Sequence, residues 1–172
     1  MKFVWIACLL ALVACGDSTG PGPSRETTFF SYASSPGEYI GAGASHSYSF
    51  PDGQWQATFD ANGNIEHITV DVNALPGGEY WTFEFSAPPG QPLVVGTYEG
   101  ARRWPFQGSL PGLSVYGNGR GCNTLAGRFV IKALAIGPGN TVDRFQATFE
   151  QNCEEASPIL TGEISIAANP WR

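Results

Sequence analysis

Hydrophobic and polar residues alternate along much of this chain. Trp55, Ala57 and Phe59, for example, alternate with polar neighbours. A period of two is typical of a β-strand with one face in the core and one in water, as in antiparallel sheets. Ten runs are predicted as strands on this pattern and on their β-forming composition. They cover residues 28–33, 45–50, 54–60, 66–73, 79–87, 92–98, 113–116, 128–136, 143–151 and 159–167.

The segments between these runs carry turn residues. Asn62-Gly63 lies between two alternating runs and predicts a hairpin. Gly and Pro punctuate residues 76–78, 88–90 and 137–140 in the same way, and no run has a convincing helical period. Ten short strands in one domain predict an all-β fold. We expect an antiparallel two-sheet sandwich of the jelly-roll kind, with a β-barrel as the alternative.

Composition and charge narrow the choice of partners. The 172 residues are 42% hydrophobic and 13% aromatic, which indicates a folded chain rather than a disordered one. The formal net charge is −6, and it becomes −7 if Lys2 is removed with a leader segment. An acidic domain repels phosphate backbones, so we expect no nucleic-acid binding.

The first fourteen residues are predicted to be a signal peptide. Lys2 precedes an apolar run of twelve residues, 3–14, which is shorter than the roughly 20 needed to span a bilayer. The run ends in Leu12-Val13-Ala14-Cys15, which resembles the lipobox of bacterial lipoproteins. The resemblance implies a diacylglyceryl group on the Cys15 thiol, cleavage before Cys15 and acylation, typically by palmitate, of the new amine. An ordinary secretory signal with a coincidental cysteine is the alternative.

The residues after the lipobox place the domain relative to the membrane. Residues 15–27 are rich in Gly, Pro, Ser and Thr and are predicted to be a flexible tether. A single β-sandwich domain would then cover residues 28–172. The lipid would be its link to the membrane, since two or more acyl chains anchor stably. Gly16 after the cysteine favours the outer membrane of the cell envelope, although Asp17 weakens that inference.

Cysteine usage predicts one disulfide. Cys8 leaves with the signal peptide and Cys15 carries lipid, so Cys122 and Cys153 remain as a pair in an oxidising compartment. The last three strands would form a meander that this bond ties together. The alternative, a metal site, lacks nearby His or Cys partners, so we expect neither a metal nor a cofactor.

Polar residues flank both cysteines. The chain here resembles a group of exported bacterial proteins of unknown activity that share a G-R-G-C-N … F-x-Q-x-C-E core, over most of residues 30–167. Arg120 is expected to pair with Glu150 or Glu154, and Asn123 to cap a turn. A structural cluster around the disulfide is favoured over a functional one, because perturbed polar clusters are often structural.

Residues 101–106 are predicted to be a loop that combines cationic and aromatic groups. Arg102, Arg103 and Trp104 are the candidate ligand-binding residues, because Arg and Trp are favoured interface anchors and loops on rigid scaffolds often bind. In the alternative, Trp104 or Phe106 packs into the core.

No catalytic set is visible in the sequence. Residues 60–66 carry oxygen ligands at alternate positions, but a plain Asn-Gly hairpin explains them without calcium. Glu79 and Glu84 are an odd number of residues apart, so a regular strand points them to opposite faces, and surface solvation accounts for both. His46 and His67 have no ligand-like spacing.

The sequence therefore favours a lipid-anchored, non-catalytic binding or surface-interaction module outside the cytoplasm. Carbohydrate or an envelope protein is the expected ligand class. The alternative is a hydrolase of envelope polysaccharide whose carboxylates converge only in the fold.

Overall fold

The computed structural model describes residues 27–59, 66–154 and 158–167. This part of the chain forms ten strands and two single-turn 3-10 helices, with no α-helix. Every predicted strand has a counterpart. The strands are β1 (Phe29–Ser34), β2 (Ser45–Ser49), β3 (Gln54–Phe59), β4 (His67–Asn73), β5 (Trp81–Ser86), β6 (Gly96–Arg103), β7 (Gly112–Gly117), β8 (Leu125–Ile136), β9 (Val142–Cys153) and β10 (Leu160–Ile166). The 3-10 turns η1 (Pro76–Gly78) and η2 (Pro138–Asn140) occupy two of the predicted turn segments.

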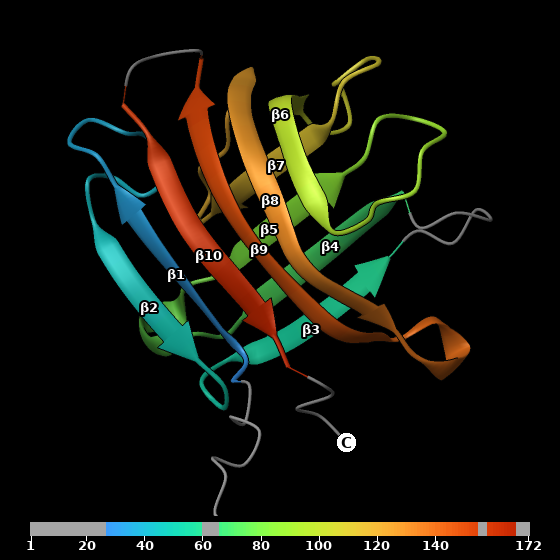
Figure 1. Cartoon of the computed structure of the whole chain (residues 1–172). Helices are drawn as coiled ribbons and strands as arrows, with labels where there is room; N and C mark the ends of the chain where they lie inside the picture. The colour runs from blue at the N-terminus through green and yellow to red at the C-terminus, as the bar shows by residue number, and fades with distance from the viewer. Residues whose placement is uncertain (1–26, 60–65, 155–157, 168–172) are drawn as a thin grey trace, which may run out of the picture.

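All ten strands belong to one sheet, in the order β2-β1-β10-β9-β8-β6-β7-β5-β4-β3. The sheet curls on itself into a half-barrel, with β1, β10, β9 and β8 on one side and β3, β4 and β5 on the other (Figure 1). Neighbouring strands are antiparallel except β6 and β7, which are parallel. The structure thus does not confirm two separate sheets, whereas the barrel alternative fits the curled sheet.

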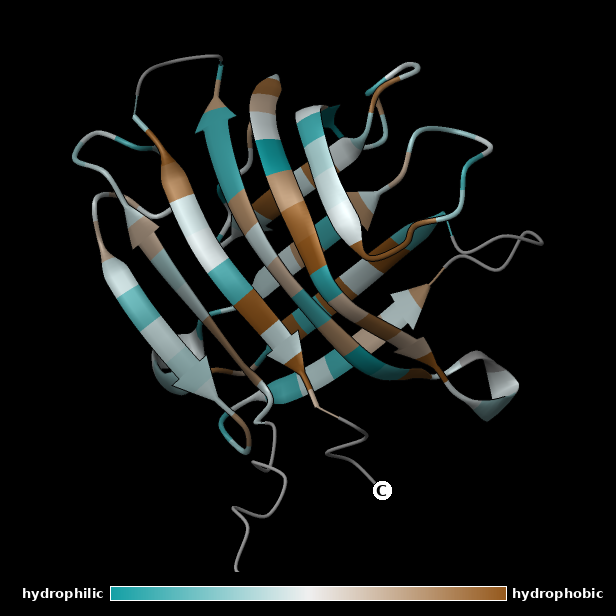
Figure 2. Ribbon diagram, in the orientation of Figure 1, coloured by the Kyte–Doolittle hydropathy of each residue, from teal (hydrophilic) through white to brown (hydrophobic). Residues whose placement is uncertain are grey.

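The strands form where alternation gives them one apolar face. In β5, Trp81, Phe83 and Phe85 are fully buried on the inner face, and hydrophobic bands recur along the other strands (Figure 2). The core lies between the two sides of the curl. Phe30 of β1 packs on Phe83 with 5.0 Å between ring centroids. This face-to-face packing explains why the sequence pattern resembles that of a sandwich.

One strand, β6, differs from its prediction and joins the two sides. The apolar run 92–98 suggested a strand there, but Val94 and Val95 are exposed. The Tyr98 hydroxyl satisfies both the N–H and the carbonyl of Val94, so no strand partner is needed. β6 instead begins at Gly96 and pairs with β8. It continues to Arg103, so Arg102 and Arg103 belong to a strand end and not to a loop.

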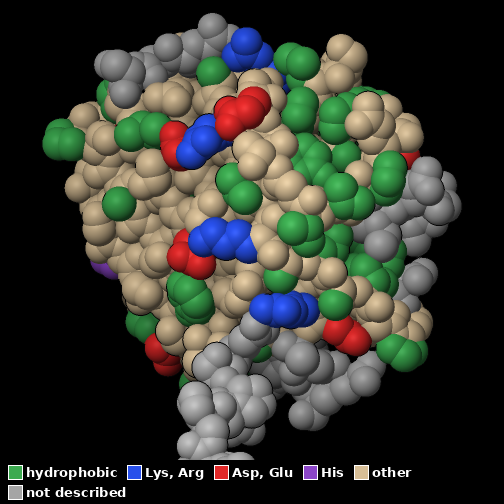
Figure 3. Space-filling model, in the orientation of Figure 1, with side chains coloured by type: hydrophobic (Ala, Val, Ile, Leu, Met, Phe, Trp, Pro, Cys, Tyr) green, Lys and Arg blue, Asp and Glu red, His purple; other side chains and the backbone are tan. Residues whose placement is uncertain are grey.

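The last three strands form the predicted meander, since β8 pairs with β9 and β9 with β10. Their outer face carries compensated charge (Figure 3). Arg128 lies 2.7 Å from Glu150 and 3.2 Å from Glu99, and Lys132 lies 3.4 Å from Glu163. These ion pairs balance the charge on the part of this face that they occupy. Within the described ranges, no helix has the length and hydrophobicity to cross a bilayer.

Candidate functional site

A cleft of about 430 Å³ opens where β6 and β7 separate. These two strands pair only at Arg102–Gly112 and Arg103–Leu113, and then they diverge. The space between them is bounded by residues of five strands and two connections. The lining consists of Glu84, Arg103, Trp104, Pro105, Ser114, Val115, Tyr116, Gly121, Cys122, Leu125 and Gln151. The divergence of these two parallel strands therefore creates a concave surface, which is the usual form of a small-ligand site.

Gln151 of β9 lies at the floor of the cleft, and its side chain is fully buried. Its Oε1 accepts from the Val115 N–H and its Nε2 donates to the Val115 carbonyl, both at 2.8 Å. The side-chain amide thus replaces a neighbouring strand along this stretch of β7. Because the backbone polar groups of Val115 are satisfied, β7 needs no strand partner there and the gap can persist.

One wall of the cleft follows directly after β6. The backbone of Trp104 is bonded to β7 on both sides, through its N–H to the Leu113 carbonyl at 3.2 Å and through its carbonyl to the Ser114 hydroxyl at 3.3 Å. Its ring stacks on His67 of β4, with 4.1 Å between centroids. Trp104 is half-buried and lies outside the core, and Phe106 is 72% exposed. The alternative that either ring packs into the core is therefore wrong.

Arg103 is the cation of the cleft. Its Nη1 donates to the Asn123 carbonyl at 3.4 Å, and the guanidinium lies 5.0 Å from the centroid of the Phe106 ring. Its neighbour Arg102 is absent from the lining, as expected when successive strand residues face opposite ways.

Glu84 faces the cleft from β5, between Thr69 of β4 and Ser114 of β7 in the sheet register. Burial raises the pKa of its carboxyl to about 7. The negative charge of Asp71 adds to the increase, and the positive charge of Arg103 opposes it. The expectation of a solvated surface carboxylate is thus wrong for Glu84, because the chain after β6 covers this part of the outer face.

A short polar chain continues from the cleft along the outer face. Tyr116 is hydrogen-bonded to Thr82, whose hydroxyl donates to the Asp71 carboxylate at 2.7 Å. Burial, and then the charge of Glu84, raise the pKa of the Tyr116 hydroxyl. Tyr116 therefore stays protonated at neutral pH, and its oxygen can accept a hydrogen bond from a ligand.

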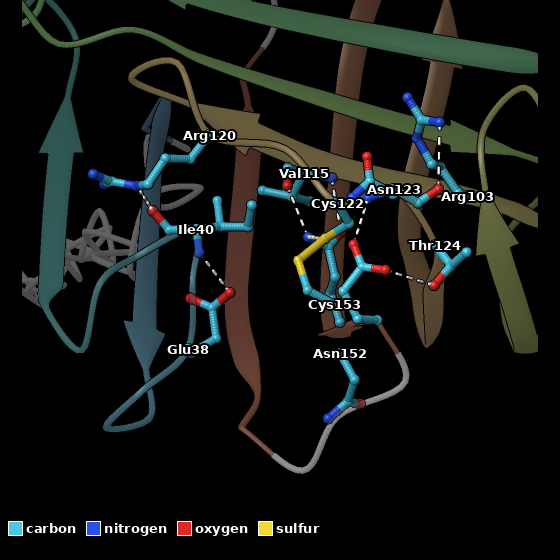
Figure 4. The surroundings of a disulfide bond; sticks show 12 residues. Glu38, Ile40, Arg103, Val115, Arg120, Cys122, Asn123, Thr124, Asn152 and Cys153 are labelled. Atoms are coloured by element: carbon cyan, nitrogen blue, oxygen red, sulfur yellow. Dashed lines mark hydrogen bonds between the residues drawn. A yellow bond between two sulfur atoms is a disulfide. The ribbon is translucent and has the colours of Figure 1, made fainter.

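The Cys122–Cys153 disulfide forms as predicted and borders the cleft (Figure 4). The surrounding polar residues do not all pair as expected. Arg120 Nε donates to the Ile40 carbonyl at 2.7 Å, whereas the partner of Glu150 is Arg128. The Arg120–Glu150 and Arg120–Glu154 pairs are therefore absent from the described structure.

Glu154 instead joins the two ends of the disulfide loop. Its carboxylate accepts from the Asn123 N–H at 2.7 Å and from the Thr124 hydroxyl at 3.1 Å. The Asn123 backbone hydrogen bond lowers the pKa of the Glu154 carboxyl. These bonds tie chain segments together, so this cluster has a structural role beside the cleft.

The remaining candidates lie elsewhere. Glu79 accepts from Trp81 Nε1 and Asn118 Nδ2, away from the cleft. His46 stacks on Tyr48 with 5.9 Å between centroids. Residues 60–65 of the possible calcium segment, 60–66, lie outside the described residues, and so does Cys15. In the described ranges, no three His, Cys, Asp or Glu side chains gather in a way that could hold a metal ion.

Sequence reasoning found Arg103 and Trp104 but missed their partners Glu84, Tyr116 and Gln151. The sequence signal for Glu84 was a carboxylate on the polar face of a strand whose other face is wholly aromatic. This signal indicates a site only once the chain segment that covers the polar face is known. Comparison of the chain with protein-family models, with curated proteins and with solved structures finds no match.

Proposed function

We propose that this protein is a lipid-anchored binding module outside the cytoplasm and that the β6–β7 cleft is its ligand site. The observation that carries the proposal is the cleft itself. Its volume of about 430 Å³ is within the range of small-molecule sites. Its lining combines aromatic walls with a few fixed polar groups, and such groups orient a ligand.

The lining suits a ring-shaped ligand such as a sugar unit. Trp104 uses one face of its ring against His67 and is one of the residues that line the cleft. Ser114 and Tyr116 supply hydroxyl groups, and Arg103 supplies N–H donors. Aromatic stacking combined with hydrogen bonds at the ring edge is the usual way in which such ligands are held. This arrangement supports binding to carbohydrate in the cell envelope.

The alternative of a polysaccharide hydrolase has one observation in its favour. Asp71 and Glu84 lie diagonally on adjacent strands, and Glu84 has the raised pKa that a general acid needs. Only Glu84 of the two lines the cleft, so the binding function is favoured. A hydrolase would release new reducing ends from envelope polysaccharide, and Glu84→Gln would abolish the release.

The binding function is tested by retention of the purified exported protein on washed cell-envelope material. Trp104→Ala should reduce retention strongly while the domain stays folded, because the ring lies outside the core. Tyr39→Ala is the matched control, since Tyr39 is an exposed aromatic residue outside the cleft. Equal retention of wild type and Trp104→Ala, or no retention of the wild type, would refute the proposal.

A further inference from the structure

Arg103 carries a positive charge that its surroundings leave largely available. Within the described part of the chain, Arg103 forms no salt bridge. Its hydrogen bond to the Asn123 carbonyl, at 3.4 Å, uses one of five N–H donors. The Phe106 ring supports the guanidinium from one side at 5.0 Å. The cleft thus presents a guanidinium that packs on an aromatic ring and has N–H donors left for a ligand.

We infer that the β6–β7 cleft takes a ligand that carries a carboxylate on a ring, with Arg103 binding the carboxylate and Trp104 packing on the ring. The planar guanidinium can bind a carboxylate through two parallel hydrogen bonds. Trp104 and Pro105 follow Arg103 directly in the chain and line the same cleft. The inference rests on the proposed function and adds the chemical class of the ligand.

Glu84 decides whether an anion can enter. The carboxyl lines the same cleft as Arg103, and its pKa is raised to about 7. When Glu84 is protonated, the cleft has an uncompensated cation and an O–H donor, and both favour a carboxylate. When Glu84 is ionised, it repels that carboxylate and competes for Arg103. Binding is therefore coupled to uptake of a proton by Glu84.

The charged and titratable groups around Glu84 come from three strands. Asp71 of β4 lies outside the lining, so its charge does not meet the ligand directly. Tyr116 of β7 has a raised pKa, so it stays neutral between pH 6 and pH 8. Arg103 of β6 is the cation among the lining residues. His67 of β4 stacks on Trp104, and because imidazole groups ordinarily titrate in this pH range, the test separates it from Glu84.

The experiment is titration calorimetry of the purified exported protein at pH 6, 7 and 8. The probes are glucuronate and benzoate, each with a neutral counterpart, glucose and benzyl alcohol. Both acids stay ionised in this range. We expect at least one acid to bind and to exceed its counterpart in affinity by about tenfold or more. Its dissociation constant should rise about tenfold from pH 6 to pH 8, with uptake of about half a proton at pH 7.

Two variants assign the effect. Arg103→Met should remove the preference for the acid, whereas Arg128→Gln, which removes one charge from the outer face, should keep it. Glu84→Gln should bind the acid with little change between pH 6 and pH 8. Equal binding of acid and neutral probe, tighter binding at pH 8, or failure of both acids to bind would overturn the inference. So would a pH dependence that survives in Glu84→Gln, because His67 would then be responsible.

The probe identifies the source of the carboxylate. Binding of glucuronate indicates an acidic sugar, and binding of benzoate an aromatic acid. The test also stands apart from the binding function. Trp104-dependent retention on envelope material without binding of either acid would leave the binding function intact and refute only the carboxylate.

Discussion

Glu84 is an acid whose surroundings favour its neutral form. It lies under the chain that follows β6, and the same cover that desolvates its carboxyl makes the cleft. A polar group in such a place costs stability when it is charged. Its presence beside Arg103 and Trp104 is therefore better explained by ligand binding than by folding.

The raised pKa of Glu84 predicts a pH dependence of stability. The carboxyl has a pKa near 4.5 when unfolded and about 7 in the fold, so the folded state binds more protons between these values. Stability should fall as pH rises from about 4.5 to about 7 and level off above that. Melting temperatures across this range measure the effect. Glu84→Gln should flatten this part of the profile, while Asp52→Asn, which removes an exposed carboxylate in the turn after β2, should not. An unchanged slope in Glu84→Gln would contradict the assignment.

Residue identity alone revealed only part of the site. Arg103 and Trp104 drew attention in the sequence because Arg and Trp are favoured interface anchors. Glu84 and Gln151 were not, since each has the polar side chain that an alternating strand normally exposes. Their roles depend on a covering segment and on an unpaired stretch of β7, and both are products of long-range pairing. The disulfide was predictable because the sequence assigns Cys8 to the signal peptide and Cys15 to the lipid, which leaves one pair of cysteines in a predicted oxidising compartment.

At the scale of elements, the disulfide connects the approach to β8 with the end of β9. Cys122 and Cys153 are 31 residues apart. Cys122→Ser should destabilise the domain by about 2–5 kcal/mol, because the unfolded chain gains freedom. Thermal unfolding measures this loss. Dithiothreitol should destabilise the wild type by a similar amount and leave the variant unaffected. Two titratable thiols at these positions in the exported protein would be the contrary result.

Close approach of strands at the cleft depends on Gly127 of β8. Gly127 lies opposite Gln151 in the register, and a Cβ there would collide with the Glu150 carbonyl and the Leu113 side chain. Gly127→Ala should therefore cost about 1–3 kcal/mol, as overpacking does. Gly96→Ala is the control, because its Cβ would meet open space in β6. Chemical denaturation compares the two; equal stability would mean that β8 can move away without cost.

Alternation of apolar and polar residues located most strands well, because it reports burial of one strand face. It failed at β6. The run 92–98 is apolar, yet Tyr98 satisfies Val94 through its hydroxyl and displaces the strand towards Arg103. The number of sheets could not be predicted from the sequence either. Two facing layers and one curled sheet bury the same faces, and only the short β6–β7 pairing distinguishes them.

At the scale of the whole molecule, the lipobox predicts how the protein is held. Cys15→Ala should abolish incorporation of labelled fatty acid and leave the chain uncleaved or soluble, because no acyl chain is attached. Metabolic labelling and membrane fractionation check this. Cys8→Ala should behave as wild type, since the predicted cleavage before Cys15 removes Cys8. Normal processing and membrane retention of Cys15→Ala would rule out lipid anchoring.

The pairing of β1 with β10 has a consequence for the timing of folding. Phe29 lies opposite Ser165, so the first strand of the sheet finds its place only beside the last. β10 also separates β1 from β9, which leaves the β1–β2 hairpin without a docking edge until β10 has been made. Such non-local closure is slow. A chain emerging from its N-terminus thus keeps this part of the sheet open until β10 is available.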